Sequence, residues 1–408
     1  MKKHWISLLP GLSCAVAACF AVVQAHAQVI GANLQSEAEG GDAHAQFQLA
    51  MAYERSEAGP QDYARAAAWL KKSAGHGNAE AQFELASLYR HGQGVDHDDA
   101  LAAALYLQAA AQGLAAAEFN IGLAYEDGEG IAQDYAQAAA WYRKAADQGM
   151  AQAQGNLGAL YLAGQGVPRD HATAAKWLRK AADQGDANAE YNLAQCYRLG
   201  TGVTQDDAQA AAWYRKAAEQ GLAQAENDLG ALYEHGVGVA QDFAEAAQWY
   251  RKAADQGVAA AQFNLALRYG LGQGVPRDDA QAAELFRKAA EQGFDRAENN
   301  LGILYEHGLG VPQDNALAAE WYRKAAAQGH AGAEYNMGRL YSEGLGVARN
   351  VAEAWFWFNL AAERSTGPQR EKAEQARGEA EKKLTAAELA KLRERAKLLL
   401  AARGQPGS

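Results

Sequence analysis

The sequence predicts an all-α protein, a solenoid in which short helix pairs stack one after another along the chain. Tyrosines recur every 36 residues, and a tryptophan or leucine follows each tyrosine 16 residues later. Apolar residues recur at helical spacing, and glycines mark the turns between the helices. A fixed period of this length is typical of stacked units, none of which can bury its apolar face alone. The repeating tyrosines are Tyr53, Tyr89, Tyr125, Tyr161, Tyr197, Tyr233, Tyr269, Tyr305 and Tyr341.

Residues 1–27 have the order of a secretory signal peptide, with two lysines, an apolar run and a closing small-residue triplet. We expect cleavage between Ala27 and Gln28, which makes the mature protein periplasmic or secreted. No later stretch is long and apolar enough to cross a bilayer, so we expect no stable membrane span once the leader is removed. Two alternatives stay open, an uncleaved anchor and a lipid anchor on Cys19.

The composition excludes several classes of protein. The formal net charge is −11, and 49% of the residues are apolar, which argues against disorder. Without the two leader lysines and the four excess positive charges of residues 366–408, residues 28–365 carry −17. So acidic a body repels polyanions, and nucleic acid is not an expected partner. Cys196 is the single cysteine after the leader, which excludes a disulfide scaffold and a four-cysteine zinc module.

The fifth repeat shows how one unit is expected to fold. Leu193 and Cys196 belong to the buried stripe of a first helix, and Gly200 ends that helix in a left-handed turn. Asp206 then opens the second helix as its N-cap or first-turn acid, and Trp213 lies in the buried stripe of that helix. The aspartates in the same register are Asp62, Asp98, Asp134, Asp170, Asp242, Asp278 and Asp314.

Glycines also stand inside several of the predicted first helices. Each of them costs about 1 kcal/mol relative to alanine in a helix interior. We expect the close approach of a neighbouring helix backbone to compensate for this cost. The positions are Gly122, Gly158, Gly230, Gly302 and Gly338.

These repeats resemble the Sel-one-like repeat, a relative of the tetratricopeptide repeat. The eighth repeat carries the pattern whole, in the runs LGILYEHGLGVPQD (residues 301–314) and WYRKAA (residues 321–326). The resemblance covers residues 42–365 and implies a right-handed α-solenoid superhelix of nine antiparallel helix pairs, with the first helices on its concave side. It also implies a role in protein interaction. The end repeats depart from the pattern, as capping repeats do, with Ser56 and Ala58 for turn glycines and Asn350 for aspartate.

After residue 365 the composition changes to glutamate, lysine, arginine, alanine and leucine. We expect residues 366–408 to form two C-terminal capping helices, at 369–383 and 386–403, with Thr385 and Glu388 spaced as a capping box. These helices should cover the apolar end of the last repeat, because a terminal repeat has no following unit to bury that face. A basic amphipathic helix that lies on a membrane is the alternative.

No motif predicts catalysis, a metal or a cofactor. The histidines lack the spacing of metal ligands, and the repeated Gly-x-Gly lacks the lysine and the strand of a phosphate-binding loop. Cys196 is expected to be a packed small hydrophobe rather than a nucleophile, because it lies in a buried stripe. Recurring Arg-Lys pairs such as Arg215-Lys216 are expected to form a solvated stripe that nearby acids compensate.

Two registers of the first helices are candidate protein-binding positions on an exposed arc. Five residues before the tyrosine an asparagine or aspartate recurs, and two residues before it the residue varies freely. The amides either hydrogen-bond between neighbouring repeats or form a polar ladder that grips a partner's backbone. The variable register is either a recognition surface or an unconstrained one. The candidates are Asn120, Leu123, Asn156, Asn192, Gln195, Asp228, Asn264, Leu267, Asn300, Ile303, Asn336 and Arg339.

The leading functional hypothesis is a non-catalytic scaffold or adaptor of the bacterial cell envelope, which binds a protein or an extended peptide in its groove. Two alternatives come from other classes. One is an envelope enzyme of the β-lactamase or penicillin-binding type found among cysteine-rich relatives, although their paired cysteines are absent here. The other is binding of a cell-wall glycan. The sequence leaves the partner's identity and the oligomeric state open.

Overall fold

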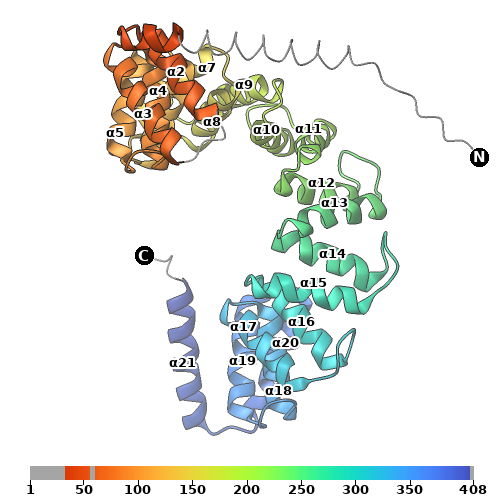
Figure 1. Cartoon of the computed structure of the whole chain (residues 1–408). Helices are drawn as coiled ribbons and strands as arrows, with labels where there is room; N and C mark the ends of the chain where they lie inside the picture. Colours follow the sequence, from red (N-terminus) through yellow and green to blue (C-terminus); the bar gives the residue numbers. More distant parts are fainter. Residues whose placement is uncertain (1–32, 56–59, 405–408) are drawn as a thin grey trace, which may run out of the picture. The chain divides into compact units, whose positions relative to one another are not determined.

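The computed structural model describes residues 33–55 and 60–404. The predicted leader, the cleavage site at Ala27 and Gln28, and Cys19 lie outside these residues, as do Ser56 and Ala58. Within the described residues the regular elements are helices, and no strand occurs (Figure 1). The all-α class predicted from the 36-residue period is therefore confirmed.

Each repeat contributes a first and a second helix of similar length. The first helices are α2 (Ala43–Arg55), α4 (Ala79–His91), α6 (Ala115–Asp127), α8 (Ala151–Ala163), α10 (Ala187–Leu199), α12 (Ala223–His235), α14 (Ala259–Leu271), α16 (Asp295–His307) and α18 (Ala331–Glu343). The second helices are α3 (Pro60–Gly75), α5 (Asp99–Ala111), α7 (Tyr135–Asp147), α9 (His171–Ala182), α11 (Asp207–Glu219), α13 (Phe243–Asp255), α15 (Asp279–Glu291), α17 (Asn315–Ala327) and α19 (Val351–Arg364).

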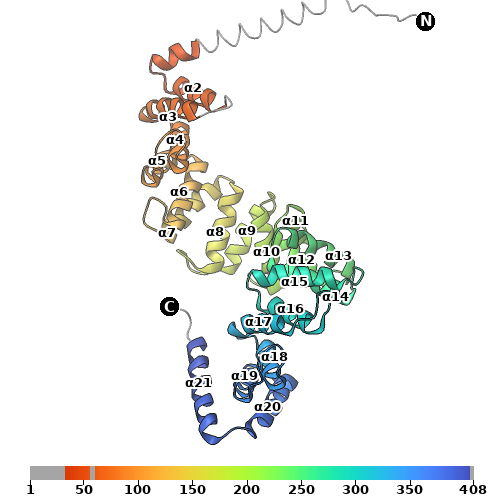
Figure 2. The same cartoon turned by 60° about the horizontal axis from the view of Figure 1, so that its bottom comes forward.

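The helix pairs group into two compact units, each of which is described by itself. The first unit contains α2 to α9 and the beginning of α10, and the second contains the rest of α10 and all later helices. In both units the two helices of a repeat pack together, and the second helix also packs against the first helix of the next repeat (Figure 2). Short turns make consecutive helices antiparallel, as predicted.

The turns and helix starts follow the local chemistry that the sequence predicts. Asp206 accepts a hydrogen bond from the Gln209 amide at 2.9 Å, as an N-cap does. Asp62 differs, because α3 already begins at Pro60 and the carboxylate lies in its first turn. Gly310, the second turn glycine of the eighth repeat, has a φ of +67°, and a Cβ there would overlap the carbonyl oxygen of Asp279 in the preceding repeat. This glycine is therefore required by the turn and by the stacking of the two repeats.

The glycines inside the first helices lie against a large side chain of the second helix, and at Gly158 and Gly230 the backbone of that helix also approaches closely, as expected. A Cβ on Gly302 would lie 2.7 Å from the Tyr322 ring, and one on Gly338 would lie 2.6 Å from the Phe358 ring. The nearest backbone atom at Gly230 is farther away, at 3.2 Å. A large side chain of the second helix thus fills the space that the glycine leaves free. Burial of that ring offsets the cost of glycine in a helix.

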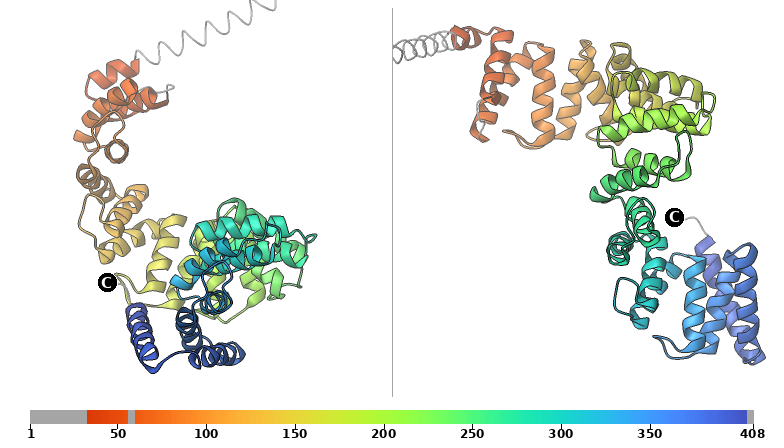
Figure 3. Two further views of the ribbon diagram at one scale, coloured as in Figure 1. Left: turned by 90° about the horizontal axis from the view of Figure 1, so that it is seen from below. Right: turned by 90° about the vertical axis from the view of Figure 1, so that its right-hand side faces the viewer.

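Two further helices follow the last repeat, α20 (Gly367–Glu381) and α21 (Ala386–Gly404). Helix α20 begins two residues before the predicted start, with a proline in its first turn. The capping box of α21 is confirmed, since the Thr385 amide donates to Glu388 at 2.8 Å and the Glu388 amide donates back at 3.3 Å. Helix α21 stands beside α19 (Figure 3), and its Leu392 and Ala396 are buried in one cluster with Trp355. The predicted capping of the last repeat is thus observed.

Among the described residues, no helix combines the length and the apolar character that a membrane crossing requires.

Candidate binding surfaces

The predicted asparagine register lies at the interfaces between repeats rather than on an open face. All of its members are half-buried. In the second unit, Asn264 Nδ2 donates to Asn227 Oδ1 at 3.1 Å, and Asn336 Nδ2 donates to Asn299 Oδ1 at the same distance. Each bond joins neighbouring first helices. At these two positions the amides act as the first alternative predicts, as a link between repeats.

Other members of this register are also held inside the protein. Asn120 Nδ2 donates to the Ala116 carbonyl oxygen of its own helix at 2.8 Å. Asn156 is hydrogen-bonded to the hydroxyl of Tyr142. Asn300 accepts a hydrogen bond from Asn299 at 3.4 Å. Asp228 accepts one from Gln195, and Asn192 is half-buried in the first unit.

The variable register is half-buried too, which corrects its assignment to an exposed arc. Leu123, Leu267 and Ile303 pack against buried core clusters that extend into neighbouring helices. Arg339 forms an ion pair with Glu306 of the preceding repeat. Burial at these positions exceeds what helical spacing predicts, because a first helix contacts second helices on two sides and the next first helix as well. Charges placed at these three apolar positions would therefore perturb folding.

A hydrogen-bonded pair of a buried tyrosine and a glutamate, not predicted from the sequence, recurs in three repeats. The Tyr250 hydroxyl donates to Glu234 at 2.7 Å, and the Tyr322 hydroxyl donates to Glu306 at 2.8 Å. Although burial opposes ionisation, hydrogen bonds from Arg339 and Tyr322 hold the pKa of Glu306 below its ordinary value. The signal was available, because these repeats combine an acid directly after the repeating tyrosine with a tyrosine directly after the tryptophan. The remaining pair is Glu126 and Tyr142.

A second missed register stands seven residues before the repeating tyrosine. Its side chains are glutamine or glutamate and are at most 5% exposed. In the eighth repeat, Gln328 at the end of α17 donates to Glu298 at 2.9 Å and to the Gly293 carbonyl oxygen at 3.0 Å. Burial raises the pKa of the Glu298 carboxyl. The register comprises Gln46, Gln82, Glu118, Gln154, Glu190, Glu226, Gln262, Glu298 and Glu334.

Most of the Arg-Lys pairs contact aromatic rings rather than the acids that were expected, although Arg287 and Lys288 both pair with Glu284. Lys252 lies over the indole of Trp249, with its Nζ 3.7 Å from the ring centroid. Arg251 reaches the next repeat and donates to the Tyr269 hydroxyl at 2.9 Å. Both basic side chains of this pair thus contact an aromatic residue of the repeats.

Cys196, the cysteine of the second unit, is not placed as a reactive nucleophile. Cys196 is 2% exposed, and burial raises the pKa of its thiol to about 11, so the reactive thiolate is disfavoured. Across the part of the chain that the structure describes, no three histidine, cysteine, aspartate or glutamate side chains lie together as metal ligands would.

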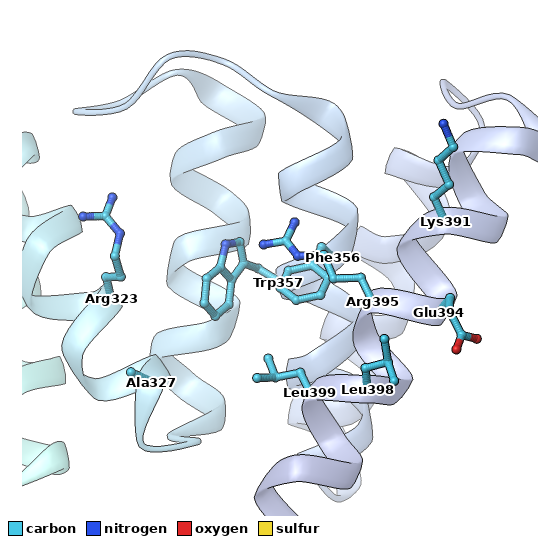
Figure 4. Close-up of a pocket in the computed structure, with 9 residues that line it drawn as sticks. All are labelled: Arg323, Ala327, Phe356, Trp357, Lys391, Glu394, Arg395, Leu398 and Leu399. Atoms are coloured by element: carbon cyan, nitrogen blue, oxygen red, sulfur yellow. The ribbon is translucent and has the colours of Figure 1, made fainter.

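An apolar hollow of about 830 Å³ lies between α17, α19 and α21 (Figure 4). Its apolar walls come from Phe356 and Trp357 of α19 and from Leu398 and Leu399 of α21. Leu398 is 62% exposed, although it stands on the helix that covers the last repeat. We call this space the terminal hollow. None of the predicted binding residues lines it, because the two predicted registers belong to first helices.

Basic side chains surround the terminal hollow. Arg323, Lys391 and Arg395 line it together with one acid, Glu394. The Arg395 guanidinium lies 3.8 Å from the centroid of the Phe356 ring and also pairs with Glu353. Neither Arg323 nor Lys391 forms an ion pair within the described chain, although the charge of Lys391 acts on Glu388 of the same helix. The hollow is therefore apolar inside and positively charged at its edge, on a protein whose repeats are acidic overall.

Comparisons with known proteins place these repeats in context. The model of the Sel1 repeat family matches nine consecutive segments, 43–78, 79–114, 115–150, 151–186, 187–222, 223–258, 259–294, 295–330 and 331–365. The chain is similar to c5321, a protective antigen present in uropathogenic Escherichia coli strains that displays an SLR fold, with 34% identity and a TM-score of 0.59 over 92% of this chain and 90% of that one. It is also similar to a Sel1 repeat protein from Oxalobacter formigenes, with 35% identity and a TM-score of 0.59 over 76% and 89%. No curated protein matched.

Proposed function

This chain belongs to the Sel1 repeat family, and we propose that it is a non-catalytic scaffold that binds another protein in the bacterial cell envelope. Solenoids of stacked helix pairs present extended surfaces and typically serve protein recognition. A partner protein or an extended peptide is therefore the proposed ligand class.

The observation that carries this proposal is that the recurring polar side chains hydrogen-bond to one another. A catalytic site needs polar groups that converge on a substrate. Here the recurring groups converge on one another: Asn336 bonds Asn299, Gln328 bonds Glu298, and Tyr322 bonds Glu306. The repeated polar groups thus hold helices together within and between repeats, as expected of a framework rather than of an enzyme.

The envelope location rests on the sequence of residues 1–27 and on one relative. The segment has the order of a cleavable leader. The relative from uropathogenic Escherichia coli is described as a protective antigen. Export is tested by fractionation and N-terminal sequencing, which should find mature protein in the envelope fraction beginning at Gln28. A cytoplasmic protein that retains Met1 would overturn this part of the proposal, and a lipid on Cys19 would convert it to the anchored alternative.

The binding function is tested by cross-linking in living cells followed by affinity capture of the tagged full-length chain. We expect a small set of proteins in near-stoichiometric amounts, which a tagged envelope protein of another fold does not capture. Purified peptidoglycan and a chromogenic β-lactam are tested in parallel. Binding to the glycan alone, or hydrolysis of the β-lactam, would reject the scaffold in favour of one of the two other classes.

A further inference from the structure

We propose that the terminal hollow binds an acidic segment of a partner protein, which inserts an apolar side chain between Trp357 and Leu398 and directs carboxylates toward Arg323 and Lys391. This inference rests on the proposed binding function and adds the place and the chemistry of the partner. Three independent observations carry it.

The first observation is the size and the apolar character of the hollow. A space of about 830 Å³ is within the range of sites that take small molecules or side chains of a partner. Along α21, Leu392 is 8% exposed and faces the last repeat, whereas Leu398 is 62% exposed and faces the hollow. An apolar side chain from a partner would cover the part of Leu398 that this chain leaves in contact with water.

The second observation is the indole of Trp357. The residue is 9% exposed, and its Nε1–H has no acceptor in the described chain. Trp355 on the same helix differs, since its Nε1 donates to Glu381 at 3.2 Å. A buried donor without an acceptor is unfavourable, so the indole gains a partner if binding turns its N–H, which is shielded from solvent here, toward a carboxylate or carbonyl oxygen of the ligand.

The ninth repeat also lacks the lysine that lies over the tryptophan in other repeats. In the eighth repeat, Lys324 lies over Trp321, with its Nζ 3.7 Å from the ring centroid. The equivalent position after Trp357 is Leu360, which is fully buried. No lysine of this repeat therefore competes for the space beside Trp357.

The third observation is the charge at the edge. Arg323 and Lys391 form no ion pair, and the Arg395 guanidinium points toward the aromatic side chains in Figure 4. Of the side chains that line the hollow, three are cations and one, Glu394, is an acid, and Arg395 is already paired with Glu353. Positive charge around an apolar site attracts and orients an acidic ligand, and it repels a basic one.

The test selects displayed random peptides that bind the purified full-length protein. Peptides that also bind the Leu398→Asp variant are removed first, so that those remaining depend on the hollow. We expect the enriched peptides to combine a large apolar residue with aspartate or glutamate. Replacing those acids by their amides should weaken a synthetic peptide about tenfold, and the double change Arg323→Glu and Lys391→Glu should weaken it by a similar factor. Lys397→Glu on the same helix is the matched control and should retain binding, because Lys397 does not line the hollow.

A change at the indole separates the Trp357 contribution from general apolar binding. Trp357→Phe keeps an aromatic ring and removes the N–H donor. We expect it to lower the affinity of the selected peptides severalfold while the melting temperature stays constant or rises. Circular dichroism of every variant confirms that the helices are intact.

Several results would overturn the proposal. Enriched peptides that are neutral or basic would reject the acidic partner, and equal binding by Leu398→Asp would reject the hollow. A concentration-dependent dimer that Leu398→Asp abolishes would assign the hollow to a second copy of this chain. If a cross-linked partner from cells still binds the Leu398→Asp variant, the scaffold function is supported and the role of the hollow is rejected. If no partner is found, both proposals are rejected.

Discussion

The eighth repeat and the C-terminal end of the second unit solve the same packing problem in different ways. In the eighth repeat, buried polar side chains meet partners from the ninth repeat, as Asn299 meets Asn336 and Glu306 meets Arg339. After the ninth repeat no tenth repeat follows, and helices α20 and α21, which lack the repeat pattern, cover the end instead. They leave the Trp357 N–H and the side chain of Leu398 without partners. The repeat pattern thus ends at a surface that α20 and α21 cover only in part.

The largest expected effect on stability concerns the packing between helices inside the repeats. Trp213→Ala should lower the free energy of unfolding by about 3 to 5 kcal/mol, because Trp213 is 5% exposed and its removal leaves a cavity between helices. Urea titration followed by circular dichroism measures the change. A loss below about 1 kcal/mol would show that the repeat interfaces are loosely packed.

The next prediction compares one glycine from each region. Gly310→Ala should cost about 2 to 4 kcal/mol, since the new Cβ meets the preceding repeat and the positive φ is unfavourable for alanine. Gly378→Ala in α20 should instead stabilise by up to about 1 kcal/mol, because no atom lies within 4 Å of the new Cβ and the residue is inside a helix. The melting temperatures of both variants measure these effects. Shifts of the same sign would contradict the predicted difference between the turn glycine and the helix glycine.

A pH-dependent effect is expected at the start of α18. The His330 ring accepts a hydrogen bond from the Ala333 amide at 3.1 Å, and burial lowers the pKa of this histidine. The unfolded chain therefore takes up the proton first, so the cap contributes above the ordinary pKa of about 6.5 and is lost as the pH falls below it. Asp295 favours the charged ring and Arg296 opposes it.

We expect acidification from pH 7.5 to 5.5 to remove about 1 kcal/mol at this cap. The matched control is His330→Asn, because Asn78 and Asn350 cap their helices without titrating. If the wild type and this variant lose stability in parallel over that range, the ring of His330 is not the titrating group.

The smallest expected effect concerns the buried glutamates, where removing a charge should raise stability rather than lower it. Burial raises the pKa of Glu298, so its ionised form is unfavourable in the folded state and the penalty is present at neutral pH. Glu298→Gln should therefore raise stability at pH 7 by up to about 1 kcal/mol, and the gain should shrink toward pH 4. Gln262 shows that the amide fits, because it accepts from Gln292 at 2.9 Å. Destabilisation at pH 7 would indicate that the carboxylate charge is needed.

The sequence was sufficient for the parts of the fold that depend on local chemistry. The N-cap at Asp206, the turn at Gly200 and the capping box at Thr385 each involve residues close together in the chain, and all were confirmed. The capping of the last repeat also followed, since its aromatic side chains require cover. Periodicity and turn chemistry act over a few residues, and one sequence displays them directly.

The candidate surfaces depend on contacts that periodicity does not display. A repeated asparagine shows that a position matters, but it does not show whether Asn264 faces solvent or Asn227. Leu267 varies in type among repeats and is still half-buried, because any apolar side chain of suitable size fills that interface. The terminal hollow lies where the repeat ends, so no register could have located it.

The turn glycine represented by Gly310 has a consequence for how such proteins change in length. Its counterparts, from Gly94 to Gly346, all fit against the start of the second helix in the preceding repeat. Every junction in the described chain therefore makes the same steric demand, and a duplicated or deleted block of 36 residues restores it. A gain or loss of any other length at a junction places a residue with a Cβ against that backbone. Genes for proteins of this kind are expected to vary in whole repeats, while their C-terminal helices stay in place.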